Sequence, residues 1–178
     1  MIRKYATQSP ILGQNIWLDP SAIVIGSVTL GDDVSIWPMT VIRGDVNYIK
    51  IGERTNIQDG SIIHVSHDGP ISPGGYPTLV GSDVTIGHGV MLHGCTIGNA
   101  CLIGMRSTVL DGAIISQHSM LGAGSLLAPN KIIPEGELWM GSPARFVRKL
   151  SAKEIENIYY SAKNYVVGKN QYISDSGQ

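Results

Sequence analysis

The chain has 178 residues and a formal net charge of −1, which leaves no large excess of either sign. There is no basic stripe of the kind that binds nucleic acid and no Lys/Arg cluster of the kind that binds an anionic membrane. The sequence contains no run of about 18 apolar residues, the length needed to span a membrane. The start of the chain also lacks the apolar core of a signal peptide. We therefore expect one well-buried domain, located in the cytoplasm.

Glycine is abundant, with 22 residues, and phenylalanine occurs once, which suits many tight turns and thin layers of aliphatic side chains. The two cysteines, Cys95 and Cys101, lack the C-x-x-C spacing of a redox or metal motif. Both fall where a small apolar side chain fits the pattern described below. Buried free thiols are therefore expected, in keeping with a reducing compartment.

Residues 1–17 form a lead-in segment in which no period emerges. From residue 18 onward, aliphatic side chains recur at intervals of six, a spacing that neither a helix nor an alternating strand explains. The expected inward positions are Leu18, Val24, Leu30, Ile36, Ile42, Ile51, Ile57, Ile63, Val80, Ile86, Leu92, Ile97, Ile103, Val109, Ile114, Met120, Leu126, Ile132 and Leu138.

This period predicts an all-β solenoid, namely a parallel β-helix of hexapeptide repeats over residues 18–143. Each repeat supplies a short strand and a turn, three repeats make one triangular coil, and stacked coils bury the aliphatic side chains together. Two slips of five residues, from Leu92 to Ile97 and from Val109 to Ile114, can each be absorbed at a corner. The segment 67–78, rich in proline and glycine, is expected to protrude as a loop.

Residues 144–178 are expected to hold a turn, a C-terminal α-helix and a tail. Ser151 and Glu154 have the spacing of a capping box at the start of a helix. Gly168 is a candidate end of that helix. The last residues, 173–178, are expected to be disordered.

The histidines interrupt the repeat where an aliphatic unit does not call for them. His64 follows Ile63 and His93 follows Leu92, so the two histidines occupy equivalent positions one coil apart. Their Cα atoms are then expected about 4.8 Å apart, the spacing of neighbouring strands. Two imidazoles placed in this way can share a zinc ion.

His88 falls on a different side of the predicted triangle and cannot reach that pair within one prism. A neighbouring copy must then supply it, which predicts a homotrimer with a three-histidine site at each interface. Three histidines with an open fourth position are typical of catalytic zinc, on which bound water becomes hydroxide near pH 7. The register of the repeat does not place the remaining two histidines at the site. His118 is expected to be solvated at a turn. His67, which opens the loop, is a possible proton shuttle.

At this point the sequence resembles the gamma-class carbonic anhydrase family over nearly the whole chain. The shared motifs are RGD at Arg43–Asp45, NIQDG at Asn56–Gly60, and GHxxxxHG at Gly87–Gly94. The resemblance implies that the prism is left-handed and that the protein is a trimer with one metal ligand donated by a neighbouring subunit. In that family the matching histidines bind the metal, here His64, His88 and His93.

The resemblance also implies roles for polar residues around the metal. The family's glutamine that orients the water or bicarbonate matches Gln58, Asn56 is a nearby polar candidate, and Tyr165 resembles a tyrosine on the family's C-terminal helix. The family's salt bridges across the subunit interface match Arg43, Asp45 and Asp59.

Two departures bear on activity. The archetypal enzyme has a glutamate where this chain has Val46, and its acidic loop carries a glutamate that shuttles protons, whereas Asp68 is the one acidic residue of segment 67–78. The first hypothesis remains zinc-bound hydroxide, or the same chemistry on iron or cobalt, hydrating carbon dioxide to bicarbonate. The alternatives are an acyl-CoA thioesterase on the same metal site, a metal-free hexapeptide acyltransferase that binds acyl-CoA between prisms, and a trimeric scaffold with a vestigial site.

Overall fold

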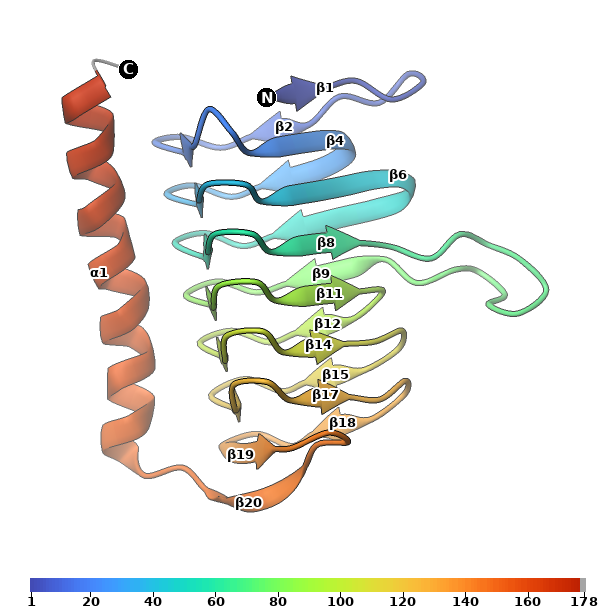
Figure 1. Ribbon diagram of the computed structural model, residues 1–178, viewed down its shortest axis with the longest axis vertical. Helices are drawn as coiled ribbons and strands as arrows, with labels where there is room; N and C mark the ends of the chain where they lie inside the picture. Colours follow the sequence, from blue (N-terminus) through green and yellow to red (C-terminus); the bar gives the residue numbers. More distant parts are fainter. Residues whose placement is uncertain (177–178) are drawn as a thin grey trace.

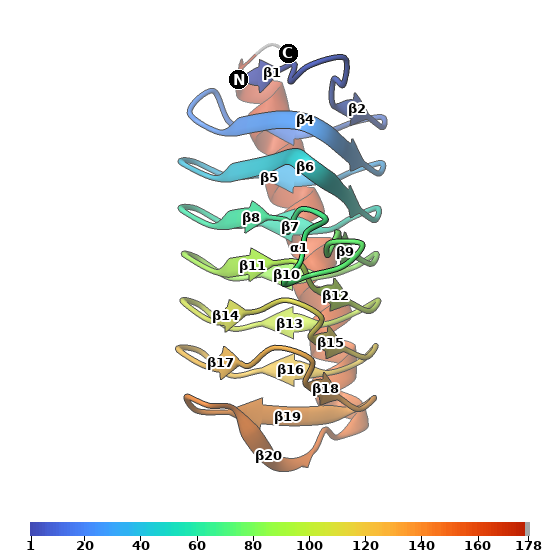
Figure 2. The same cartoon turned by 90° about the vertical axis from the view of Figure 1, so that its right-hand side faces the viewer.

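The computed structural model describes residues 1–176 and shows the expected left-handed parallel β-helix with one long helix along its side (Figure 1). Short strands stack in three columns, which form the faces of a prism (Figure 2). The first face contains β3 (Trp17–Leu18), β5 (Ser35–Ile36), β7 (Asn56–Ile57), β10 (Thr85–Ile86), β13 (Leu102–Ile103), β16 (Met120–Leu121) and β19 (Glu137–Met140).

The other two faces are joined into one sheet by long strands that turn a corner of the prism. These are β4 (Ile23–Leu30) and β6 (Val41–Ile51). The second face continues through β8 (Ile62–His64), β11 (Met91–His93), β14 (Thr108–Val109) and β17 (Leu126–Leu127). The third face continues through β9 (Thr78–Val80), β12 (Thr96–Ile97), β15 (Ile114–Ile115) and β18 (Ile132–Ile133).

Coils stack in register, so one aliphatic residue lies directly above the next. Ile86 pairs with Ile57 on one side and Ile103 on the other, and all three are fully buried. The core is therefore a column of side chains from successive coils, which no single coil could bury alone. Cys95 and Cys101 are buried free thiols, as expected, and burial raises the pKa of each to about 12.

The expected inward positions are wrong in the last coils. Ile114 and Ile132 are 38% and 55% exposed, while Ile115 and Ile133 are fully buried. The spacing from Val109 to Ile115 is six, so the expected second slip does not occur. Each of these strands has two adjacent aliphatic residues, so the sequence allows either of them to be the inward one. Stacking on the preceding coil decides between them. The same one-residue correction replaces Met120 and Leu126 by the buried Leu121 and Leu127. In the last coil it replaces Leu138 by Trp139, which is partly buried against the core.

The lead-in residues join the solenoid although their sequence shows no period. Two short strands, β1 (Ile2–Arg3) and β2 (Ile11–Leu12), pair in parallel with β4. Their side chains are exposed, so backbone pairing rather than core burial places them. This explains why hydrophobic periodicity did not reveal them.

At the other end, β20 (Arg145–Lys149) pairs antiparallel with β19 and leads into α1 (Ala152–Ser176). The predicted capping box is present, because the Glu154 carboxylate accepts from Ser151 N at 2.9 Å and Ser151 Oγ accepts from Glu154 N at 3.3 Å. The helix does not end at Gly168 but continues to Ser176, so the expected tail is helical over residues 173–176, and residues 177–178 lie outside the described part.

Helix α1 lies against the first face and contacts β3, β5, β7 and β10. Its buried side chains are Ile158, Ala162 and Lys169. Lys169 is fully buried and its Nζ lies 2.9 Å from Asp33 Oδ1, so an ion pair holds the second half of the helix to the first coils. Segment 67–78 protrudes between β8 and β9, as expected, although Thr78 already begins β9 (Figure 1).

Candidate metal centre

His64 and His93 stand side by side at the ends of β8 and β11 on the second face. The two residues are direct partners in the parallel register. His64 Nδ1 and His93 Nε2 face each other at 3.1 Å. The predicted equivalence of the two positions is thus confirmed.

Each of these rings has its other nitrogen bonded to a carboxylate of its own chain. His64 Nε2 lies 3.0 Å from Asp45 Oδ1, and His93 Nδ1 lies 2.6 Å from Asp111 Oδ1. The second oxygen of Asp111 accepts a hydrogen bond from Ser66 Oγ at 2.6 Å. Carboxylates placed behind imidazoles fix the tautomer, and they leave the facing nitrogens with lone pairs that can bind a cation.

Electrostatics around this pair keep the carboxylate charged and the imidazole neutral. Burial opposes ionisation of Asp45, but the hydrogen bond with His64 and the contact with Arg43 hold the pKa of this carboxyl below its ordinary value. Burial, reinforced by the charge of Arg43, lowers the pKa of His64 despite its bond to Asp45. A neutral imidazole is the form that binds a metal.

The geometry of the pair fits a tetrahedral metal ion. Two nitrogens bound to zinc at about 2.0–2.1 Å lie about 3.3 Å apart. The two facing nitrogens are 3.1 Å apart, so little movement is needed. Imidazole donors also suit iron and cobalt, so the donor set alone does not select zinc.

His88 lies at the corner between the first and second faces, after β10. Its Nδ1 lies 2.9 Å from Asp59 Oδ2, and its side chain is 50% exposed. This third histidine therefore has the same carboxylate support, with Nε2 free. Within residues 1–176 of a single chain, no group of three His, Cys, Asp or Glu side chains converges on one metal position.

The charged residues expected at the subunit interface have partners within their own chain. Arg43 forms an ion pair with Asp45, two residues away on β6. Asp59 is bonded to His88. A contact between Arg43 and an Asp59 of a neighbouring copy stays a prediction, since both residues lie beside a histidine of the candidate site.

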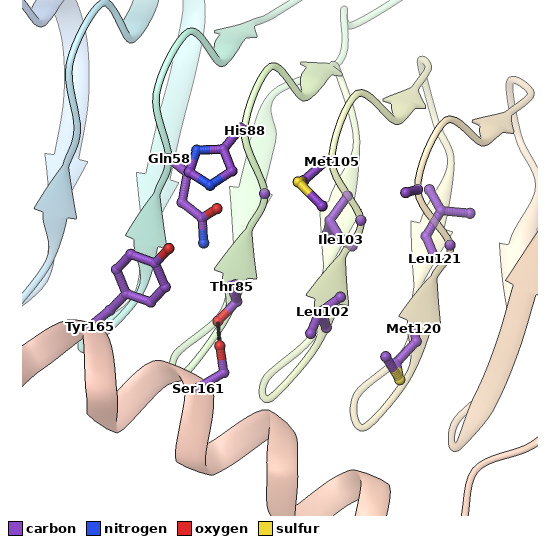
Figure 3. A pocket seen from close by; sticks show the side chains of 14 residues that line it. Gln58, Thr85, His88, Leu102, Ile103, Met105, Met120, Leu121, Ser161 and Tyr165 are labelled. Carbon is purple, nitrogen blue, oxygen red and sulfur yellow. Dashed lines mark hydrogen bonds between the residues drawn. The ribbon is translucent and has the colours of Figure 1, made fainter.

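The three other predicted residues gather near His88. Gln58 and Tyr165 line a cavity of about 420 Å³ together with His88, whereas Asn56 is buried beside Gln58. Figure 3 shows His88, Gln58 and Tyr165 at one end of this cavity, with Leu102, Ile103, Met105, Met120 and Leu121 extending away from them. Burial, reinforced by the charge of Asp59, raises the pKa of Tyr165 and keeps its hydroxyl protonated.

The two remaining histidines behave differently. His67 is exposed and lines a second cavity of about 400 Å³, whose wall also includes Ser66, Tyr76 and Asp111. His118 is not simply solvated as expected. Its Nδ1 lies 3.1 Å from Glu135 Oε1 and its Nε2 lies 3.0 Å from the Tyr159 hydroxyl, because the corner of the prism faces α1 at this point.

Asp111 is a further residue of the site, one that the sequence motifs do not predict. The signal was weak: Asp111 precedes Gly112 at a corner, where an aspartate is expected for turn geometry alone. Its distance in sequence from His93, 18 residues, equals one coil of the solenoid, and this would have revealed it.

The family model described as Bacterial transferase hexapeptide (six repeats) matches residues 9–44. Gamma carbonic anhydrase 2, mitochondrial, of Arabidopsis thaliana is 47% identical over 159 residues, which cover 89% of this chain and 57% of that protein. Probable carbonic anhydrase of Methanocaldococcus jannaschii is 42% identical over 156 residues, covering 88% of this chain and 94% of that protein. The chain belongs to the gamma-carbonic-anhydrase-like family of hexapeptide-repeat proteins.

Other members of this family carry less specific names. Protein YrdA of Escherichia coli is 52% identical over 178 residues, covering the whole of this chain and 97% of that protein. The solved structure of a hexapeptide transferase family protein from Anaplasma phagocytophilum has a TM-score of 0.89 at 42% identity, covering 97% of this chain and 98% of that one. A gamma-carbonic-anhydrase-like chain thus shares its architecture, over nearly its full length, with a protein named as a hexapeptide transferase. Among residues 1–176, no helix is long and apolar enough to cross a membrane.

Proposed function

We propose that this chain is a metalloenzyme that hydrates carbon dioxide to bicarbonate at the interfaces of a homotrimer. The observation that carries the proposal is the arrangement of three histidines, each bonded on one side to a carboxylate. Two of them, His64 and His93, turn their free nitrogens toward each other at 3.1 Å. His88 offers a third free nitrogen from a different corner of the prism.

The residues present fit a bound zinc ion, with iron or cobalt as alternatives. His64 and His93 of one protomer and His88 of its neighbour would hold the ion, and Asp45, Asp111 and Asp59 would orient these rings. When bound, such an ion supplies a Lewis acid that lowers the pKa of water to near 7. A threefold arrangement makes three equivalent junctions, so each protomer serves two of them.

The surroundings of His88 suit a small, apolar substrate. The surface of the cavity walls is mostly apolar, with leucine, isoleucine and methionine side chains among them, and such walls admit carbon dioxide. At the end of the cavity next to His88, Gln58 and Tyr165 provide the polar groups that orient the substrate and the bicarbonate product. Asn56 acts on Gln58, to which it is hydrogen bonded.

Hydration also releases a proton, which must leave the site. His67 is the side chain we assign to this step, because it is exposed and shares a cavity wall with Asp111, the partner of His93. Val46 stands where the archetypal enzyme has a glutamate. It is 45% exposed, and its side chain cannot carry a proton. We therefore expect proton transfer to buffer, rather than bond formation to carbon dioxide, to limit turnover.

Metal analysis of the purified protein, paired with stopped-flow hydration of carbon dioxide, tests the proposal. We expect about one metal ion per chain, hydration that is lost with a chelator and restored by zinc or cobalt, and rates that rise with buffer concentration. Metal at trace level, or stoichiometric metal without hydration, would exclude the proposed enzyme. His67→Ala should lower the rate at low buffer concentration and have little effect at high concentration.

A second candidate is hydrolysis or transfer of an acyl group from acyl-CoA. It is favoured by the length of the apolar cavity, which reaches from His88 to Met120 and exceeds what carbon dioxide needs. Assaying thioester cleavage in the presence and absence of a chelator separates metal-dependent thioester hydrolysis from metal-free acyl transfer. A location in the cytoplasm suits either reaction and agrees with the two free thiols.

A further inference from the structure

A chain of hydrogen bonds runs from helix α1 to Gln58, beneath the helix and against the first face. Ser161 Oγ lies 3.1 Å from Thr85 Oγ1, and Asn56 Nδ2 lies 3.0 Å from the same Thr85 oxygen. Gln58 Nε2 lies 3.1 Å from Asn56 Oδ1. Asn56, Gln58 and Thr85 are all buried. Figure 3 shows the Thr85–Ser161 bond beside Gln58 and Tyr165.

The direction of each bond in this chain is fixed from one end. Asn56 Nδ2 also lies 3.3 Å from the backbone oxygen of Val84, which can only accept a hydrogen bond. The Asn56 atom on that side must therefore be the amide nitrogen, and its oxygen must face Gln58. Gln58 can satisfy that oxygen only with its own nitrogen. Its oxygen, Oε1, is then left to face the cavity that it shares with His88 and Tyr165.

We infer that Thr85 and Ser161 are positioning residues that hold the Gln58 amide with its oxygen toward His88. The Thr85 hydroxyl accepts a hydrogen bond from Asn56 Nδ2 and makes a second hydrogen bond with Ser161 Oγ. These bonds disfavour a 180° rotation of the Asn56 amide. Without the Thr85 hydroxyl, one Asn56 donor loses its partner, and a buried unpaired donor is costly. Asn56 would then be held only by its longer contact with the Val84 carbonyl, at 3.3 Å, and the amides of Asn56 and Gln58 would turn together more often.

The orientation matters for what Gln58 recognises, and this step rests on the proposed function. An amide oxygen accepts from an O–H group, such as that of water or bicarbonate, whereas an amide nitrogen donates to an oxyanion. A fixed acceptor therefore selects a proton-bearing oxygen next to His88. Helix α1 takes part in this selection through Ser161, which gives the helix a role beyond covering the first face.

The experiment compares Thr85→Val, which keeps the shape and removes the hydroxyl, with Thr85→Ser, which keeps the hydroxyl. Ser161→Ala removes the last member of the chain, and Tyr160→Phe removes an exposed hydroxyl one residue away as a matched control. Selective ¹⁵N-glutamine labelling reports the Gln58 side-chain NH₂ group, identified by its absence in Gln58→Met. This readout does not depend on any enzymatic activity.

We expect hydrogen exchange of the Gln58 NH₂ group to be slow in the native protein, Thr85→Ser and Tyr160→Phe. In Thr85→Val it should be at least about tenfold faster, with a smaller change in Ser161→Ala. Where hydration is measurable, Thr85→Val should lower kcat/KM about tenfold and Thr85→Ser should restore it. Unchanged exchange in Thr85→Val would overturn the inference. Altered exchange without any hydration by the native protein would instead sink the proposed function and leave the positioning role standing.

Discussion

The coils that carry the histidines and the coils beyond them share one backbone and differ in their outward side chains. His93 of β11 is followed one coil later by Leu110, directly after β14, and the inward residues Leu92 and Val109 pair in the same register. The inward column continues without change, whereas the outward column turns from polar to apolar. The prism therefore supplies spacing and rigidity, and the proposed chemistry would depend on a few outward positions in adjacent coils.

The largest effect expected from this comparison concerns the metal. Replacing His64, His88 or His93 singly by Ala leaves two imidazoles, which hold zinc far more weakly than three. Each variant should lose most of its metal when measured by elemental analysis after dialysis. His118→Ala is the matched control from a lower coil and should keep the full metal content. Equal loss in all four variants would show that the effect is one of folding.

The inward columns should respond alike in both regions. Ile86→Ala in a site coil and Leu121→Ala in a lower coil each remove a fully buried side chain from the same face. Each should cost about 2–5 kcal/mol of unfolding free energy in denaturant titrations. A much smaller cost for Ile86→Ala would indicate that the site coils owe their stability to something other than the shared core.

Behind the histidines, Asp111 is expected to act through His93. Asp111→Asn removes the charge that accepts from His93 Nδ1, so metal affinity should fall about 10- to 100-fold in competition with a chelating dye. Asn130 occupies the same corner one coil further, where its backbone nitrogen donates to the Asp111 carbonyl. Asn130→Ala should leave metal affinity unchanged. Similar losses from both substitutions would assign the effect to the corner backbone.

A smaller effect is expected at the proposed junction. Arg43→Ala removes a half-exposed guanidinium that pairs with Asp45 and that we propose to contact a neighbouring copy. The trimer should dissociate at higher protein concentration than the native one in analytical ultracentrifugation. Because such exposed ion pairs contribute little, the shift should be modest. If Arg43→Ala trimers dissociate no more readily, the assignment of Arg43 to the junction is wrong.

The period of six in the sequence predicts most of the fold, because each coil repeats one requirement for an inward aliphatic side chain. It also places His64 beside His93, since residues in equivalent positions must stack. Where two aliphatic residues adjoin, as at Ile114 and Ile115, either could point inward, and only the neighbouring coil decides. The lead-in strands and the continuation of α1 through Gly168 depend on backbone pairing and helix docking, which leave no periodic signal.

Around the site, the sequence identifies the histidines and two of the aspartates behind them, Asp45 and Asp59, but misses other residues that support the site. Asp111 and Thr85 are ordinary residues of the repeat and Ser161 is an ordinary residue of α1. Their roles appear only when residues 18 or 29 positions apart in adjacent coils, or α1 and the prism, are brought together. Gln58 is visible through its motif, but the direction of its amide depends on the Val84 carbonyl beside Asn56.

A subunit-exchange experiment tests most directly whether two copies share one site. One parent carries His88→Ala, and the other carries both His64→Ala and His93→Ala, so neither can assemble a complete set of histidines. After exchange, some junctions place the intact His88 of one chain against the intact pair of another. The account predicts that metal binding reappears in the mixture, in proportion to such junctions, while both parents remain metal-free. If mass spectrometry shows mixed trimers and metal binding does not return, the three histidines do not form a shared site.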